Sequence, residues 1–259
     1  AQTKGQVVDA EDFAREVEAS TKQVIQDQAE AGIDVGNNGE QSRISFSTYV
    51  TLRLSGFGGS WPRKQPKDRQ DPAVGLMTPP KCIGPVVYER LDEAEKECDD
   101  FLKAAGTGRF EELFMTAASP GIIAITMMNE HYSSYEAYVM AVAEEMRKEY
   151  EVIASRGLVL QLDCPDLAME RHMSHQDEPL SVFQDLVRLH VRAINQAIRN
   201  IPSEMVRLHA CWGNYEGPHI YDVAMADILP ILYEARVGAL VLEMGNPRHA
   251  HEYKAFSRH

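Results

Sequence analysis

Two periodicities of apolar residues alternate along the chain, one typical of helices and the other typical of strands. Residues 9–31 carry Phe13, Val17, Val24 and Ile25 at helical spacing, with acidic residues early in the segment and Gly32 as a stop signal. Similar patterns predict further helices at residues 133–156, 181–201 and 222–235. Short apolar runs predict strands at residues 33–35, 82–87, 110–116, 158–162, 206–211 and 239–243.

Glycine and proline mark the segments between these elements. Residues 56–80 are rich in Gly, Pro and charged residues, which is typical of a long surface loop. Residues 117–121 read Ala-Ala-Ser-Pro-Gly, a small-residue turn that would let a ligand approach the backbone closely.

Strands separated by helices of this length predict parallel β-α units, arranged either as an open doubly wound sheet or as a closed barrel. Two observations favour the barrel. Polar residues recur at the carboxyl ends of the strands, where barrel active sites are built, and no Gly-x-Gly-x-x-Gly loop marks a dinucleotide site. Capping of the following helix explains any one of these polar residues equally well. They are Glu40, Asp163, His209, Cys211 and Glu243.

Length and composition set the class of the protein. A chain of 259 residues with 44% hydrophobic content can form one barrel domain over residues 1–259. The net charge of −13 argues against nucleic acid or an anionic membrane surface as a partner. Its 4 cysteines lack the spacing of a disulfide framework, and neither a signal peptide nor a membrane-spanning stretch is evident. We therefore expect a reducing, cytoplasmic setting.

The sequence His209-Ala-Cys211, at the end of a predicted strand, is the main candidate for chemistry. Residues i and i+2 of a strand share a face, so the imidazole and the thiol can reach one metal ion. A parallel neighbouring strand ending in Glu243 would bring a carboxylate to the same point. Nitrogen, sulfur and oxygen donors together suit Zn²⁺ better than Mg²⁺ or Ca²⁺. A core histidine beside a buried thiol is the alternative interpretation.

Four segments resemble a known family, the cobalamin-independent methionine synthases, in their zinc-dependent catalytic domain. The same segments resemble the single-domain bacterial relatives of these enzymes, which include epoxyalkane:coenzyme M transferase. The segments are Ile33-Asp34-Val35 through Gly39-Glu40-Gln41-Ser42, Gln161-Leu162-Asp163-Cys164-Pro165-Asp166, His209-Ala-Cys211-Trp-Gly-Asn214-Tyr-Glu-Gly217 and Glu243-Met-Gly-Asn246-Pro247-Arg248-His249.

The resemblance implies a (β/α)₈ TIM barrel of the methionine synthase and uroporphyrinogen decarboxylase type. It implies zinc as the cofactor, with His209, Cys211 and Glu243 as ligands, and it assigns Glu40 and Asp163 to the amino group of homocysteine. The family also has a first strand with a Gly-Ser-Leu-Pro-like run and a further cysteine ligand in an Asp-Cys-Gly turn after the last strand. This sequence contains neither, so we expect an incomplete barrel of strands two to seven, from a shortened chain or from a metal-free protein.

Other polar residues near these segments have candidate roles. Trp212 and Asn214, together with Tyr215 and His219, follow His209-Ala-Cys211 and would line the pocket. Arg43 would hold an anionic substrate tail. Cys164 should point to the helix side of its strand, and His249 and His251 are expected on a helix surface.

The predicted function is alkyl transfer, with methyl as the expected group, to a zinc-activated thiol such as homocysteine. Its partners are a small-molecule thiol acceptor and an alkyl donor, without nucleic acid or membrane, and a homo-oligomer is left open. One alternative is epoxide opening by a zinc-bound thiolate, as in epoxyalkane:coenzyme M transferase. Another is a metal-free barrel of the uroporphyrinogen decarboxylase type, for which the scattered arginines give little support, and a third is a non-catalytic zinc-binding or thiol-binding protein.

Overall fold

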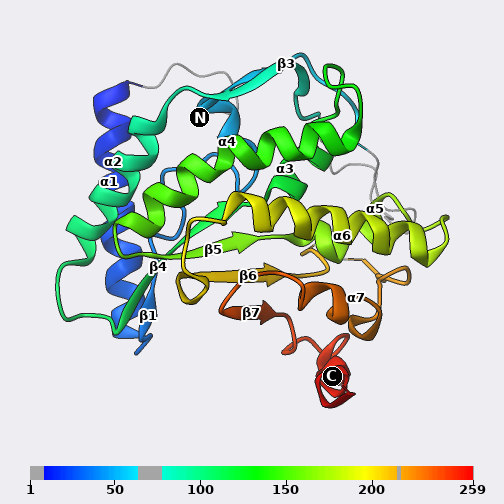
Figure 1. The fold of residues 1–259 in the computed structure, drawn as a ribbon. Coiled ribbons are helices and arrows are strands. Elements are labelled where there is room, and N and C mark those ends of the chain that lie inside the picture. Colours follow the sequence, from blue (N-terminus) through cyan, green and yellow to red (C-terminus); the bar gives the residue numbers. More distant parts are fainter. Residues whose placement is uncertain (1–8, 64–77, 215–216, 259) are drawn as a thin grey trace.

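A parallel sheet forms the centre of the computed structural model, which describes residues 9–63, 78–214 and 217–258 (Figure 1). Its strand order is β1-β4-β5-β6-β7, and every neighbouring pair is parallel. The strands are β1 (Val35–Gly36), β4 (Glu112–Ala118), β5 (Val159–Asp163), β6 (Val206–Ala210) and β7 (Ala239–Leu242). The predicted parallel β-α architecture is therefore confirmed, with five of the roughly eight strands of a closed barrel present in the described part of the chain.

Helices cover one face of this sheet, and Figure 1 shows α4 and α6 running along it. The helices are α1 (Ala10–Glu30), α2 (Leu91–Ala105), α3 (Pro120–Thr126), α4 (Tyr135–Ser155), α5 (Met169–Met173), α6 (Leu180–Ala197) and α7 (Met225–Leu232). Short 3₁₀ segments are η2 (Thr48–Leu52), η3 (Pro165–Leu167), η4 (Ser203–Met205) and η5 (Ala250–Arg258). No helix in the described ranges is long and apolar enough to cross a membrane.

The predicted strand at 82–87 forms, but it lies outside the parallel sheet. Strand β3 (Lys81–Tyr88) pairs antiparallel with β2 (Leu54–Gly58). The predicted loop at 56–80 thus begins within a strand, and residues 64–77 lie outside the described residues. Glycine is poorly suited to strand interiors, which hid β2 from pattern reading. Gly56 has φ of 92° beside a register shift in the ladder, where a bulge favours glycine.

The small-residue run at 117–121 is not a ligand-facing turn. Ala117 and Ala118 end β4, and the Ser119 side chain accepts a hydrogen bond from the Ile122 amide to cap α3. The backbone of Gly121 lies against Asp166 and His190. The small residues therefore permit close packing of protein on protein rather than access for a ligand.

Side chains of the central strands divide by alternation between the two faces of the sheet. Leu160, Leu162 and Leu208 are fully buried and belong to the main hydrophobic cluster. The opposite, inner face carries polar rows, because register places Gln161 beside Arg207 and Asp163 beside His209. The carboxyl end of the inner face is therefore where Asp163 and His209 meet.

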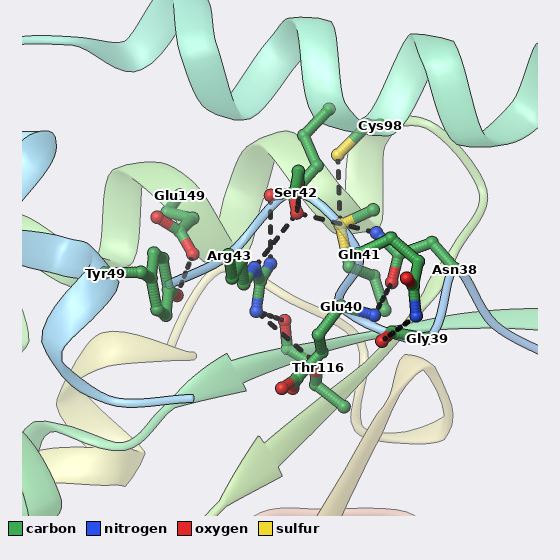
Figure 2. Close-up of polar contacts among 12 residues, drawn as sticks. Asn38, Gly39, Glu40, Gln41, Ser42, Arg43, Tyr49, Cys98, Thr116 and Glu149 are labelled. Atoms are coloured by element: carbon green, nitrogen blue, oxygen red, sulfur yellow. Dashed lines mark hydrogen bonds and ion pairs between the residues drawn. The ribbon is translucent and has the colours of Figure 1, made fainter. Parts of the chain in front are cut away.

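A buried ion-pair network joins α2, α4 and the segment that follows β1. The Glu97 carboxylate pairs with Arg43 at 3.0 Å and with Arg53 at 2.7 Å, and Arg53 also pairs with Glu149 at 3.1 Å. The Tyr49 hydroxyl donates to Glu149 (Figure 2). Burial of paired charges fixes the geometry of this region, since each charge has hydrogen-bonding partners.

Candidate functional site

His209 and Asp163 form the best-defined polar contact at the carboxyl end of the sheet. They are register partners on β6 and β5, and the His209 Nδ1 atom lies 3.0 Å from Asp163 Oδ1. The His209 side chain is 32% exposed and that of Asp163 is 14% exposed, so a small molecule on the inner face can reach both. With Nδ1 held by the carboxylate, the Nε2 atom is the nitrogen left for a ligand.

The surroundings of His209 favour its protonated form. The hydrogen bond that His209 donates to Asp163, followed by its hydrogen bond to Cys211, raises the pKa of His209 to about 10, although burial acts in the opposite direction. The imidazole is therefore charged at neutral pH in this arrangement. A metal ion would have to displace that proton, because metals bind neutral imidazole.

Cys211 and Glu243 leave neighbouring strands at equivalent positions. Ala210 pairs with Leu242, so each of these residues follows the last registered pair of β6 and β7. The predicted parallel neighbours are thus confirmed, and both side chains are partly exposed. Within the described residues, however, no three His, Cys, Asp or Glu side chains form a group that could hold a metal ion. The structure joins His209 to Asp163 and Cys211, and it leaves Glu243 at the next strand end.

A series of hydrogen bonds from neighbouring side chains of β5 and β6 holds the Asp163 carboxylate. Gln161 Nε2 donates to Asp163 Oδ1 at 2.9 Å, and Arg207 Nε donates to Gln161 Oε1 at 2.8 Å. The Arg207 guanidinium lies over the Phe114 ring, 3.7 Å from its centroid. This row of side chains fixes the Asp163 carboxylate, and through it the His209 ring.

Glu40 lies at the carboxyl end of β1 in a conformation unusual for a residue with a side chain. Its φ is 57°, in the left-handed region, and its amide donates to Asn38 Oδ1 at 3.0 Å. Its carboxylate accepts a hydrogen bond from the Thr116 hydroxyl at 2.5 Å (Figure 2). A side chain held at this energetic cost at a strand end is a sign of function.

Arg43 does not project toward a substrate. Its side chain is 2% exposed, it forms the ion pair with Glu97, and its Nη1 donates to the Thr116 carbonyl at 2.8 Å (Figure 2). The proposed anionic-tail contact is therefore wrong, because the guanidinium is already used inside the protein. Cys164 is fully buried and its thiol donates to the Leu162 carbonyl, as a structural thiol would.

The predicted site residues in the loop after β6 differ in their burial. Trp212 is 1% exposed, with its indole Nε1 donating to the Val223 carbonyl at 2.7 Å. Asn214 is exposed. Tyr215 lies outside the described residues. Of these predicted pocket residues, Asn214 therefore faces solvent, while Trp212 packs in the interior.

Sequence reasoning missed a buried histidine cluster next to this loop. His172, His219 and His249 surround the carboxylate of Asp222. His249 was expected on a helix surface, yet it is 4% exposed. The frequency of histidine between residues 209 and 251 was the available signal, but only the tertiary fold brings these residues together.

A cleft of about 500 Å³ lies elsewhere, between α1 and α2, and it is lined by none of the predicted site residues. We take the carboxyl ends of β1, β5, β6 and β7 as the candidate site, because the predicted site residues follow these strands.

Comparisons with known proteins show what the chain is similar to. No protein-family model matches the chain. It is 29% identical over 213 residues to a methionine synthase of Pyrococcus furiosus, covering 79% of this chain and 54% of the relative. It is 27% identical over 237 residues to a methionine synthase of Pyrococcus horikoshii, covering 91% and 60% respectively. The chain thus spans little more than half the length of these curated relatives.

Solved structures give the same result for the fold. A B12-independent methionine synthase from Shewanella sp. W3-18-1, in complex with selenomethionine, superimposes with a TM-score of 0.69 at 20% identity, covering 90% of this chain and 64% of that one. A putative vitamin-B12 independent methionine synthase from Listeria monocytogenes gives a TM-score of 0.62 at 18% identity, covering 98% and 79%. The family resemblance predicted from the sequence is therefore confirmed: the chain is similar in sequence to methionine synthases and in fold to B12-independent methionine synthases.

Proposed function

We propose that the protein transfers a methyl group to the sulfur of a small thiol of the homocysteine class, in a zinc-dependent reaction. The observation that carries the proposal is the set of His209, Asp163 and Cys211, which lie together at the carboxyl end of a parallel sheet. Sequence similarity to methionine synthases supports the choice of a methyl group and of homocysteine.

The residues present fit a zinc ion in their chemistry. The Asp163 carboxylate holds His209 through Nδ1, an arrangement that commonly orients a metal-binding imidazole. Cys211 supplies a sulfur donor in contact with the same ring, and Glu243 supplies an oxygen donor from the adjacent strand end. We propose these three as the ligands. When bound, zinc would lower the pKa of a substrate thiol so that the thiolate forms near neutral pH.

The chain's own residues would bind and orient the acceptor. Glu40 and Asp163 present carboxylates that suit the ammonium group of an amino-acid thiol, and the Thr116 hydroxyl fixes the direction of Glu40. The sulfur–carbon bond forms as the bond between the methyl carbon and its donor breaks, and the donor leaves with the bonding electron pair. The thiol proton passes to solvent or to the leaving donor.

The two alternative enzyme classes have no comparable support. The relatives described above are methionine synthases, which do not point to epoxide opening or to a decarboxylating barrel. A metal-free tetrapyrrole site would also leave the contact between His209 and Cys211 without a role.

The first test is metal content and thiol alkylation in the full-length protein. We expect about one zinc ion per chain by elemental analysis, lost in Cys211→Ser and retained in Cys82→Ser, because Cys82 is buried and donates to the Gly84 carbonyl. Homocysteine with methyl donors should give methylated product, while coenzyme M with epoxypropane should give none. The proposal would be refuted if the wild-type protein, as purified, contained no zinc and alkylated no thiol.

A further inference from the structure

The loops that follow three successive strands meet at one buried carboxylate. His172 lies on α5, in the segment after β5, and His219 and Asp222 lie in the loop after β6. His249 lies in the segment after β7. Strand β5 ends at Asp163, β6 ends directly before Cys211, and β7 ends directly before Glu243. We define His172, His219, Asp222 and His249 as the loop cluster.

The side chains of the loop cluster are buried, and two of its histidines lie within hydrogen-bond distance of Asp222. His219 Nδ1 lies 3.1 Å and 3.0 Å from the two oxygens of Asp222, and His249 Nε2 lies 3.0 Å from Asp222 Oδ2. His172 Nδ1 is 3.8 Å from Asp222 Oδ1, and its ring stacks on that of His219 with centroids 5.2 Å apart. The Asp222 side chain is 8% exposed. The Asp222 carboxylate is therefore within hydrogen-bond distance of imidazoles from two loops, and a third imidazole, that of His172, lies beside it.

Trp212 connects the loop cluster to the candidate site. Its indole stacks on the His249 ring with centroids 3.7 Å apart and planes inclined by 8°. Trp212 directly follows Cys211, and His249 is in the same segment as Glu243. The stack thus joins the loop that follows Cys211 to the segment that follows Glu243. A second link runs in parallel, since the Met225 amide donates to Glu252 at 3.1 Å.

His249 has a single polar anchor in this arrangement. Its Nδ1 is buried and has no hydrogen-bond partner among the described residues. The Nε2 atom therefore donates to Asp222, which sets the tautomer and the plane of the ring. Loss of the Asp222 acceptor would free the ring that packs against Trp212.

We propose that Asp222 is a positioning residue that holds the loops after β5, β6 and β7 in one arrangement and so fixes Cys211 relative to Glu243. This inference rests on the proposed function, because the loop cluster is inferred to position the ligands of the proposed zinc site. Asp222 is not one of the proposed zinc ligands. It acts through His249 and Trp212.

The test compares variants of the full-length protein that break one contact at a time. Asp222→Asn weakens the shared acceptor, His249→Phe keeps a flat ring on Trp212 but removes the hydrogen bond, and His249→Gln keeps a donor near the Nε2 position. Asp185→Asn is the matched control, because Asp185 is exposed and pairs only locally with Arg188. Zinc affinity is measured by competition with a chromophoric chelator, and folding by circular dichroism.

We expect Asp222→Asn and His249→Phe to weaken zinc binding by about 10- to 100-fold, as loss of outer-shell partners generally does. His249→Gln and Asp185→Asn should stay within about threefold of wild type on the same scale. If Asp222→Asn does not fold, the contrast between His249→Phe and His249→Gln decides alone. Unchanged zinc affinity in folded Asp222→Asn, or equal losses in the two His249 variants, would overturn the inference.

A separate readout distinguishes this inference from the proposed function. The chain has 2 tryptophans, so a Trp61→Phe background leaves Trp212 as the only indole emitter. If wild-type protein binds no zinc, the proposed function fails. The fluorescence emission of Trp212 then tests whether Asp222 is coupled to the stack of Trp212 and His249. A shifted emission in Asp222→Asn supports coupling of Asp222 to the stack, and an unshifted emission overturns it.

Discussion

Glu40 combines a strained backbone with a carboxylate that accepts a hydrogen bond from Thr116 on β4. Left-handed φ costs roughly 1 kcal/mol for a residue with a Cβ, and the adjacent Gly39, with φ of 63°, shares the turn without that cost. Asn38 and Thr116 stabilise this conformation through the backbone and the side chain respectively. The turn therefore directs the carboxylate rather than merely ending β1.

We expect Glu40→Gln to raise the KM for homocysteine by about 10-fold or more, since a charged hydrogen bond contributes about 1.5–3 kcal/mol. The deaminated analogue of homocysteine should show no such change, because it has no ammonium group to lose. Steady-state kinetics with both thiols measure the difference, with Glu89→Gln, at an exposed position, as the control. Equal effects on the two thiols would mean that Glu40 does not bind the amino group.

Sequence reasoning succeeds for residues whose placement follows from strand geometry alone. His209 and Cys211 share a face because alternation along a strand is fixed, and β7 lies beside β6 because short parallel crossovers favour neighbours. It fails where burial depends on distant segments. His249 was expected on the surface, and Arg43 was expected to face a ligand, but Asp222 and Glu97 hold them inside.

At the scale of elements, the end of β4 and the start of α3 are held by a buried polar chain. Ser119 donates to Asp166 at 2.7 Å, Asp166 pairs with His190 at 2.7 Å, and His190 Nε2 lies 2.8 Å from the Tyr135 hydroxyl. The chain joins four separate segments behind the strand ends. Gly121 lies directly against it and has no room for a side chain.

Gly121→Ala should therefore destabilise the protein by roughly 1–3 kcal/mol, the usual cost of overpacking, despite the higher helix propensity of alanine. Urea unfolding measures this change. Gly84→Ala serves as the control, because the nearest atom to its Cβ would be the Gly56 Cα at 3.7 Å, an ordinary contact. If the Gly121→Ala protein were as stable as the control, Asp166 and His190 would have to move aside at little energetic cost.

Elements with strong periodicity were predictable, and those with mixed signals were not. Helix α1 was predicted almost to its ends because Asp9 caps it, accepting from the Glu11 and Asp12 amides. Helix α2 was not predicted, although Ala94, Cys98, Phe101 and Ala105 repeat at helical spacing. Its many charged residues mask that stripe. Strand β2 was hidden by its glycines, which carry no side chain to mark an apolar face.

The molecule as a whole depends on the ion-pair network between α2, α4 and the segment after β1. Burial alone would raise the pKa of Glu97, but Arg43 and Arg53 outweigh it and hold the pKa at about 2. The ordinary value is 4.5, so the pKa is depressed in the folded state. Glu97 then contributes stability that is present above about pH 4.5 and is lost as the pH falls towards 2.

Glu97→Gln should lower the free energy of unfolding at neutral pH by roughly 3–5 kcal/mol, because it leaves buried arginine charge uncompensated. Its stability should also fall less steeply than that of wild type as the pH drops below 4.5, since the titrating group is gone. Urea unfolding across this pH range measures both effects, with Glu18→Gln at an exposed ion pair as the control. A wild-type pH slope in Glu97→Gln would contradict the assignment.

The parallel class of the central sheet was predictable from the sequence, whereas the set of strands that form it was not. Alternating helices and strands predict parallel pairing because crossovers require it, and the sheet of β1, β4, β5, β6 and β7 confirms this. The pattern cannot tell which apolar runs join the sheet. Strand β3 has the composition of a sheet strand but pairs with β2 instead, a choice made by distant contacts.

The interior network contains as many arginines as glutamates, so its formal charges cancel. Changing one member alone leaves an unbalanced charge where water cannot screen it, whereas exchanging all four for apolar side chains of matching volume leaves the interior neutral. Variation in Arg43, Arg53, Glu97 and Glu149 should therefore be concerted, with single steps disfavoured and joint replacement tolerated.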